Sequence, residues 1–170
     1  MKTTSIPLMA AILIGAIAPA AAQTQPGAHA GQSTAEAAPA IDVPAAAQAP
    51  VAVADAFGTA LAGADFDAVE AMLDPQVIIL ESGGAERSRS EYLAHHARSD
   101  AKFLAGAHST LVRRRARVEG DTAWVASESE LHASKDGKSM TLLSTETMVL
   151  SNTAQGWRIV HIHWSSRPRK

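Results

Sequence analysis

Two histidines two residues apart, not far from a carboxylate in the sequence, are the first candidates for chemistry. His161 and His163 stand in the run WRIVHIHWSS, and Glu146 precedes them in TETMVL. A carboxylate beside an imidazole orients the ring and favours its charged form, which suits an acid/base pair. Imidazole nitrogens and a carboxylate oxygen are also ligands for zinc, copper or non-haem iron. We therefore treat Glu146, His161 and His163 as catalytic candidates and as the ligands of any divalent metal.

Hairpin turns connect the expected strands that would carry these residues. Strand-like sequence covers 107–119, 122–133, 139–151 and 157–166. The pairs Gly120-Asp121 and Asp136-Gly137 are typical two-residue turns, and a turn of fixed length sets the register of the strands on either side. Counting from them, the basic run RRRAR presents alternate arginines to water. The opposite face is apolar and carries Ser127 next to Glu146, which is the one acidic residue expected on that face.

The last hairpin decides whether the histidines join Glu146. A four-residue loop ending at Gly156 pairs Glu146 with His163 and points both His161 and His163 inward. A loop one residue shorter or longer reverses the faces and turns the apolar neighbours of these histidines inward instead. We favour the first register because it gives the buried carboxylate a partner and places Gly156 where a turn suits glycine.

Three helices are expected before the last four strands. Helical spacing covers 51–62, Asp65 can cap a second short helix, and Ser88 with Glu91 forms a capping box for a third. The β-branched run at 77–82 predicts a strand between them, and the stretch DAKFLAG after the third helix is expected to be a turn. This order predicts an α+β domain in which the helices cover one face of a curved antiparallel sheet.

Five further side chains are expected to line the pocket that this arrangement encloses. We assign ligand binding to Glu81 at the end of the first strand, Tyr92 and His96 on the third helix, Ser127, and Trp157. In the pair His95–His96, the second histidine shares the helix face of Tyr92. The choice between the two histidines stays open.

The first 50 residues carry export and linker signals. Residues 1–22 have a positive start at Lys2, an apolar middle and small residues before Gln23, which together predict a secretory signal peptide. Residues 23–50 are rich in Ala, Pro, Gln and Gly, and their lack of large apolar side chains predicts a disordered tether. We therefore expect a periplasmic or secreted protein without membrane contact after cleavage.

Composition narrows the class of protein further. Residues 51–167 are enough for one small domain, and 168–170 form a tail. The 170-residue chain has no cysteine, which excludes disulfides and thiolate metal sites. Its formal net charge of −2 argues against a general nucleic-acid binder, so we expect no nucleic-acid partner.

Four segments carry a family resemblance: VADAFGTALAGADFDAVEAML, EYLAHHARSD, TETMVL and GWRIVHIHWSSR. Over residues 51–167 the chain is similar to the SnoaL-like branch of the nuclear transport factor two-like superfamily. The resemblance implies a cone-shaped fold, in which a strongly bent antiparallel sheet wraps around three helices and leaves a pocket at the open end. It also implies dimers formed through the outer sheet face.

The resemblance does not identify a reaction. Members of the family include polyketide cyclases, a steroid isomerase, dehydratases and binding proteins. The isomerase-type site needs an acidic base together with a tyrosine and a protonated acid. The single tyrosine, Tyr92, is expected on a helix and does not match that arrangement, so the sequence does not support an isomerase assignment.

Three functions therefore stay open. The leading hypothesis is an exported domain that binds a small, partly apolar molecule; as an enzyme it would be a lyase, isomerase or hydrolase working by His/Glu acid-base chemistry without an organic cofactor. The alternatives are a periplasmic metal-binding or metal-stress accessory protein and a noncatalytic dimeric interaction module. An apolar patch on the outer sheet face suits a homodimer contact. In the favoured register it comprises Leu143, Val149, Val160, Ile162 and Trp164.

Overall fold

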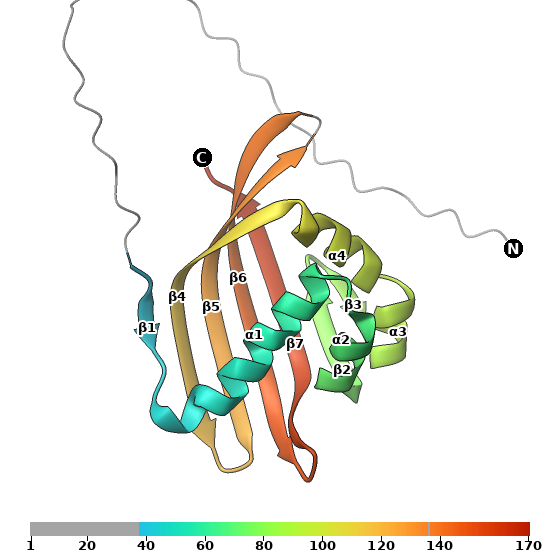
Figure 1. Ribbon diagram of the computed structural model, residues 1–170, viewed down its shortest axis with the longest axis vertical. Helices are drawn as coiled ribbons and strands as arrows, with labels where there is room; N and C mark the ends of the chain where they lie inside the picture. The colour runs from blue at the N-terminus through green and yellow to red at the C-terminus, as the bar shows by residue number, and fades with distance from the viewer. Residues whose placement is uncertain (1–37, 136) are drawn as a thin grey trace, which may run out of the picture. The chain divides into compact units, whose positions relative to one another are not determined.

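Four long strands form the centre of the sheet in the computed structural model, which describes residues 38–135 and 137–170 (Figure 1). They are β4 (Ala107–Glu119), β5 (Thr122–Lys135), β6 (Lys138–Thr153) and β7 (Gly156–Pro168), and each is antiparallel to the next. The flanking strands are β1 (Ala40–Asp42), β2 (Leu73–Glu81) and β3 (Gly84–Glu86). The strand order is β1-β4-β5-β6-β7-β2-β3, with β1 parallel to β4 and β2 parallel to β7. The expected signal peptide and residues 23–37 of the expected tether lie outside the described residues.

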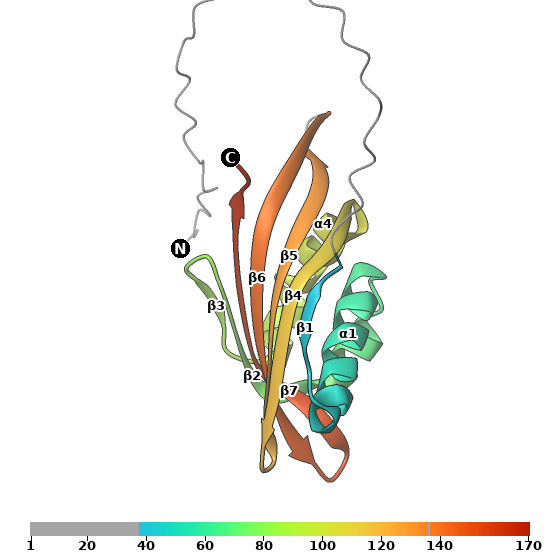
Figure 2. The same ribbon diagram turned by 90° about the vertical axis from the view of Figure 1, so that its left-hand side faces the viewer.

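The helices lie against one face of this sheet, which confirms the predicted α+β class. The helical segments of the described chain are η1 (Ala45–Ala47), α1 (Gln48–Ala62), α2 (Phe66–Met72), α3 (Arg89–Ala94) and α4 (Ala97–Ala105). Figures 1 and 2 show α1 lying along one side of the sheet, with α4 next to its end. None of the helices among these residues is long and apolar enough to cross a membrane.

Side-chain caps set the starts of two helices as the sequence predicted. The Asp65 carboxylate accepts a hydrogen bond from the Ala68 amide at 3.1 Å at the start of α2. The Ser88 hydroxyl accepts one from the Glu91 amide at 3.1 Å at the start of α3. Each cap satisfies an amide that has no partner within its helix.

Helix α4 replaces the turn expected over DAKFLAG. Ala97 and Ala101 are buried one helical turn apart, and the small side chains let α4 approach α1 closely. The sequence of this stretch lacks a stripe of large apolar residues, which is why helical periodicity was not apparent. The loop that returns the chain to β4 begins at Gly106.

Part of the expected tether belongs to the folded domain. β1 pairs with β4, and the Asp42 carboxylate accepts hydrogen bonds from Arg115 at 3.1 Å and from Arg117 at 2.7 Å. Ala47 and Pro50 are buried. The disordered tether expected over residues 23–50 is therefore wrong for residues 40–50, which include β1, η1 and the start of α1.

The second hairpin has the expected register, and the first has it from the turn as far as Arg113, beyond which a bulge at Val112 shifts β4 by one residue. Glu119 pairs with Thr122 across the first turn, and Ser127 lies opposite Glu146 on β6. The basic run alternates as predicted, and its outward-facing Arg113 forms an ion pair with Glu128 at 3.5 Å.

A β-bulge changes the register of the last hairpin. Leu150 pairs with Ile159, but Val149 pairs with His161, so Val160 is an extra residue on β7. A one-residue insertion moves all side chains beyond it to the opposite face of the sheet.

The bulge reverses the faces that the sequence predicted for the end of β7. Trp164, and not His163, lies opposite Glu146. Ile162 is fully buried, whereas His163 is exposed. The expected register of this hairpin is therefore wrong beyond Ile159.

The apolar core lies directly beside the polar residues described below. One cross-strand row consists entirely of buried residues: Ala116, Val125, Met148, Ile162 and Ile79. Phe57 and Leu61 of α1 belong to the same core, and each is 1% exposed. Burial of a large apolar side chain contributes about 1.5–3 kcal/mol. This packing fixes α1 against the sheet and so fixes the width of the space beyond the row.

Candidate functional site

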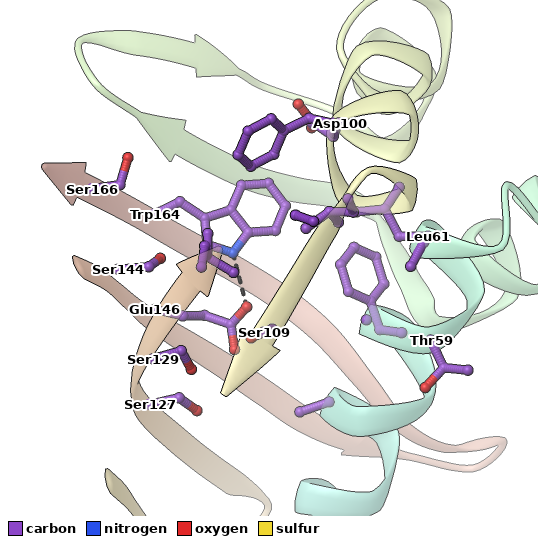
Figure 3. A pocket seen from close by; sticks show the side chains of 18 of the residues that line it. Thr59, Leu61, Asp100, Ser109, Ser127, Ser129, Ser144, Glu146, Trp164 and Ser166 are labelled. Carbon is purple, nitrogen blue, oxygen red and sulfur yellow. Dashed lines mark hydrogen bonds between the residues drawn. The ribbon is translucent and has the colours of Figure 1, made fainter. Parts of the chain in front are cut away.

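The next row along the same strands is polar. Arg114 on β4, Ser127 on β5, Glu146 on β6, Trp164 on β7 and Glu81 on β2 follow one another across the sheet. Figure 3 shows the carboxylate of Glu146 and the indole of Trp164 side by side in this row. The sequence therefore concentrates charge and hydrogen-bonding groups one step beyond its apolar core.

This row forms one wall of a cavity of about 680 Å³. Phe57, Leu61 and Leu104 contribute apolar side chains from α1 and α4. The sheet contributes a set of hydroxyl groups to the wall: Ser109, Ser127, Ser129, Ser144 and Ser166. A cavity of this size and mixed lining suits a small molecule with an apolar body and a polar group.

Glu146 is fixed at the centre of the polar row. The indole Nε1 of Trp164 donates a hydrogen bond to Oε2 of Glu146 at 2.8 Å. Burial raises the pKa of Glu146 above the ordinary glutamate value, while the Trp164 hydrogen bond and the charge of Arg114 act in the opposite direction. A carboxyl group with a raised pKa in a cavity is a candidate proton donor or acceptor.

Arg114 connects the polar row to α1. Its Nε donates to the Ser127 hydroxyl at 3.1 Å, and its Nη1 donates to the Asp55 carboxylate at 2.6 Å. The Arg114 side chain is only 14% exposed. The sequence interpretation considered the RRRAR run as a solvated face and missed Arg114, although the same alternation that turns its neighbours outward turns this residue inward.

A second cavity of about 180 Å³ adjoins the first, and Glu81, Asp100 and Trp164 line both. The Tyr92 hydroxyl donates to Asp100 at 3.0 Å and is therefore engaged by that carboxylate. Burial raises the pKa of both Asp100 and Glu81, and Asp100 raises that of Glu81 further. Burial also raises the pKa of the Tyr92 hydroxyl. Acidic groups thus line both the Glu146 side and the α4 side of the larger cavity.

The paired histidines do not join this site. The ring Nδ1 of His161 donates to the carbonyl of Ile78 at 2.8 Å, and neither His161 nor His163 lines either cavity. The expected cluster of Glu146, His161 and His163 is therefore wrong, both as an acid/base pair and as a set of metal ligands. The physical reason is the bulge at Val160, which turns both rings away from Glu146.

Four of the five side chains expected to bind a ligand line one of the two cavities. Ser127 lines the larger cavity, Glu81 lines both, and Tyr92 and His96 line the smaller one. Trp157 lines neither and packs against the apolar core. Their part in binding a ligand stays a prediction.

Trp164 takes the cavity position that the sequence interpretation gave to Trp157. Its ring stacks on Phe57 with a centroid distance of 6.4 Å and lies 6.3 Å from Tyr92. The expected outer patch therefore loses Trp164 and Ile162, which both face the interior. The outer side of β2 instead exposes Ile78 and Leu80.

The comparison with known families agrees with this architecture. A model of the SnoaL-like domain matches residues 51–169. The chain belongs to the SnoaL-like domain family. Its fold is that of the NTF2-like proteins, as the sequence resemblance implied. No curated protein matches the chain.

Solved structures support the family assignment. A proposed ketosteroid isomerase from Shewanella frigidimarina is 34% identical, with a TM-score of 0.69 and coverage of 74% of this SnoaL-like chain and 100% of its own. The S. rosetta CaMKII hub is 26% identical, with a TM-score of 0.60 over 78% of this chain and 100% of its own. A proposed dehydratase of the NTF2-like family from Streptomyces avermitilis shares 21% identity and a TM-score of 0.57 over 71% and 95%, which shows the fold alone.

Proposed function

We propose that this SnoaL-like domain binds a small, partly apolar molecule in the larger cavity and moves a proton on it, with Glu146 as the general base. The proposal rests on the position and the environment of the Glu146 carboxyl group. It lines the cavity, is held by Trp164 at 2.8 Å, and has a pKa raised by burial. A raised pKa brings a carboxylate closer to the pH at which it accepts and returns a proton efficiently.

The cavity lining supports a ligand of this kind. Phe57 and Leu61 offer apolar contact to a ring or chain, whereas Ser129 and Ser144 can donate hydrogen bonds to an oxygen of the ligand. Because Trp164 holds one carboxylate oxygen of Glu146, the other is left to face the bound molecule.

Proton transfer beside a carbonyl is the reaction that best fits these groups. Glu146 would take a proton from the carbon next to the carbonyl, and the electron pair would pass to the carbonyl oxygen. In a β,γ-unsaturated ketone, the same carboxyl would return the proton to the γ-carbon while the electron pair on oxygen re-forms the carbonyl and the double bond moves to the α,β position, which gives an isomer. In a β-hydroxy ketone, it would give the proton to the hydroxyl while the carbonyl re-forms, an α,β double bond forms and the C–O bond breaks, which releases water. The isomerase name of the S. frigidimarina protein, which is 34% identical, supports this reaction class.

The experiment tests proton transfer directly. The purified domain is incubated in deuterated water with a panel of ketones that includes a β,γ-unsaturated 3-ketosteroid, and deuterium uptake and double-bond migration are followed by NMR. Glu146→Gln should lower any observed rate by about 10²- to 10⁴-fold. Glu128→Gln, which changes an exposed glutamate on the outer face, is the matched control. Rates that are equal in the Glu146 variant and the wild type would overturn the assignment of the base.

Two further proposals concern location and assembly. We propose that the chain is exported, which is supported by the signal-like composition of residues 1–22. Mass spectrometry of the protein from its own host should find a mature chain that starts at Gln23. We also propose a homodimer through the outer sheet face, where Ile78 and Leu80 are exposed.

A further inference from the structure

A second cluster of ligating side chains lies at the edge of the sheet, outside the larger cavity. Glu86 on β3, Glu91 on α3 and His95 at the end of α3 each place one donor atom within 4.8 Å of the others. The ring Nδ1 of His96 contacts the Glu86 carboxylate as well. Four potential ligands therefore converge from β3, α3 and the junction between α3 and α4.

The local fold explains why these residues meet. Helix α3 ends at Ala94 and α4 begins at Ala97, so the two histidines occupy the break between the helices. Both Nδ1 atoms approach the Glu86 carboxylate, and that of His95 lies 3.8 Å from Oε2. A break at adjacent histidines thus directs two imidazoles toward one carboxylate on the edge strand.

This cluster differs from an ordinary cluster of acidic residues on a protein surface because one of its carboxylates is buried. Glu86 is only 5% exposed, and a buried carboxylate needs a cationic or hydrogen-bonding partner. Glu86 and Glu91 bring two carboxylate groups together in the cluster. Arg89, the basic residue at the start of α3, is engaged with Glu70 at 3.3 Å. A divalent cation would neutralise the cluster.

We propose that Glu86, Glu91 and His95, with His96 beside them, form a binding site for a divalent transition metal such as Zn²⁺. Imidazole nitrogen with carboxylate oxygen suits zinc, whereas magnesium and calcium favour oxygen ligands alone. The His95 side chain is 64% exposed, so its ring can turn to bring the donors to bonding distance. A bound ion would tie β3 to the junction of α3 and α4.

This site is distinct from the metal site expected from the sequence. That expectation combined Glu146 with His161 and His163, which the fold separates. It is also independent of the proton-transfer proposal, because Glu86, Glu91 and His95 do not line the larger cavity. Either proposal can fail while the other holds.

Zinc binding to the full chain tests the site. The protein is stripped with EDTA, and Zn²⁺ is titrated in competition with a chromogenic chelator, with native mass spectrometry to count the ions. We expect one Zn²⁺ that depends on the cluster, an affinity at least about tenfold lower in His95→Ala, and loss of this ion in Glu86→Gln. Cobalt substitution should give visible absorption bands that His95→Ala removes.

A matched control comes from another pair of histidines. His108 and His132 have stacked rings on β4 and β5, and His132 lies 4.0 Å from Glu130. Replacing both with alanine should leave zinc binding unchanged. The proposal is overturned by a wild-type chain that binds no Zn²⁺, by binding that survives His95→Ala at full strength, or by loss of binding in the control. Because His95 is exposed, its variant decides the question even where Glu86→Gln does not fold.

Discussion

The indole of Trp164 donates its hydrogen bond to the carboxylate of Glu146 at 2.8 Å, between neighbouring strands and against the cavity. The two residues lie directly opposite each other on β7 and β6. The pairing holds one carboxylate oxygen in place and offsets part of the cost of burying its charge. This arrangement is the reason that we propose Glu146 as the base in the larger cavity.

Trp164→Phe should raise the pKa of Glu146 further. The indole hydrogen bond favours the charged carboxylate and now holds the pKa down against the effect of burial. Loss of the donor from a buried acceptor should also lower the free energy of unfolding by about 1–3 kcal/mol. Carbon-13 NMR titration of labelled glutamate carboxyls measures the first effect and urea unfolding the second. Trp124→Phe, on the outer face, is the control, and an unshifted Glu146 titration would contradict the role given to Trp164.

Glu146 should make the wild type less stable as the pH rises through the range in which this carboxyl titrates in the folded protein. Because burial raises its folded-state pKa, the native protein binds this proton more tightly than the unfolded chain does. The contribution from Glu146 to the free energy of unfolding therefore decreases as pH rises from 4.5, the ordinary glutamate value, through the higher folded-state pKa. Above that point the contribution is constant.

Glu146→Gln isolates this contribution from those of Asp100 and Glu81, whose pKa values are raised in the same direction. Relative to wild type, the variant should gain stability as pH rises through the window. Urea unfolding at a series of pH values measures the difference. A difference that stays constant with pH would show that Glu146 titrates in the folded protein as it does in the unfolded chain.

The parts of the fold that depend on short-range signals could be predicted from the sequence. The two-residue turn at Gly120-Asp121 and the caps at Asp65 and Ser88 act within a few residues, and each has the expected geometry. Register counted from the turns also places Glu146 on the inner face opposite Ser127. The position of Glu146 on the inner face could therefore be predicted from the sequence.

The missed features depend on contacts that a local pattern does not contain. Val160 follows Ile159, and two β-branched residues are equally compatible with a regular strand or a bulge. One extra residue there exchanges the histidines for Trp164 inside the cavity. Likewise, Asp42 bonds to Arg115, 73 residues later in the chain, so no nearby residue signals that β1 joins the sheet.

Arg114→Gln should weaken ligand binding in the larger cavity, whereas Arg113→Gln should not. The two arginines are adjacent, but Arg114 faces the cavity and Arg113 pairs with the exposed Glu128. Loss of the Arg114 charge should also raise the pKa of Glu146, because that charge now lowers it. Isothermal titration with a ligand found in the ketone panel compares the variants. Equal affinities of the two variants would mean that the Arg114 guanidinium does not act on the ligand and only holds α1 in place through Asp55.

Phe57→Ala should destabilise the domain by about 3–5 kcal/mol, because the ring is fully packed against Trp164 and the core. Phe103→Ala removes a ring that is 42% exposed and should change stability by no more than about 0.5 kcal/mol. Urea unfolding of both variants at one pH gives the comparison. Similar losses for the two would contradict the placement of Phe57 at the centre of the packing.

The proposed dimer should depend on the outer side of β2. Ile78 is 46% exposed and Leu80 is 37% exposed, and these positions two residues apart share one face of the strand. Replacing both with glutamate would place charge where a second subunit must bury apolar surface, so sedimentation should show a dimer for the wild type and a monomer for the double variant. Val112→Glu changes a residue of similar exposure, 43%, on β4 and should leave the assembly unchanged. A wild-type monomer would overturn the proposed dimer, and a double variant that still dimerises would show that the interface does not involve this side of β2.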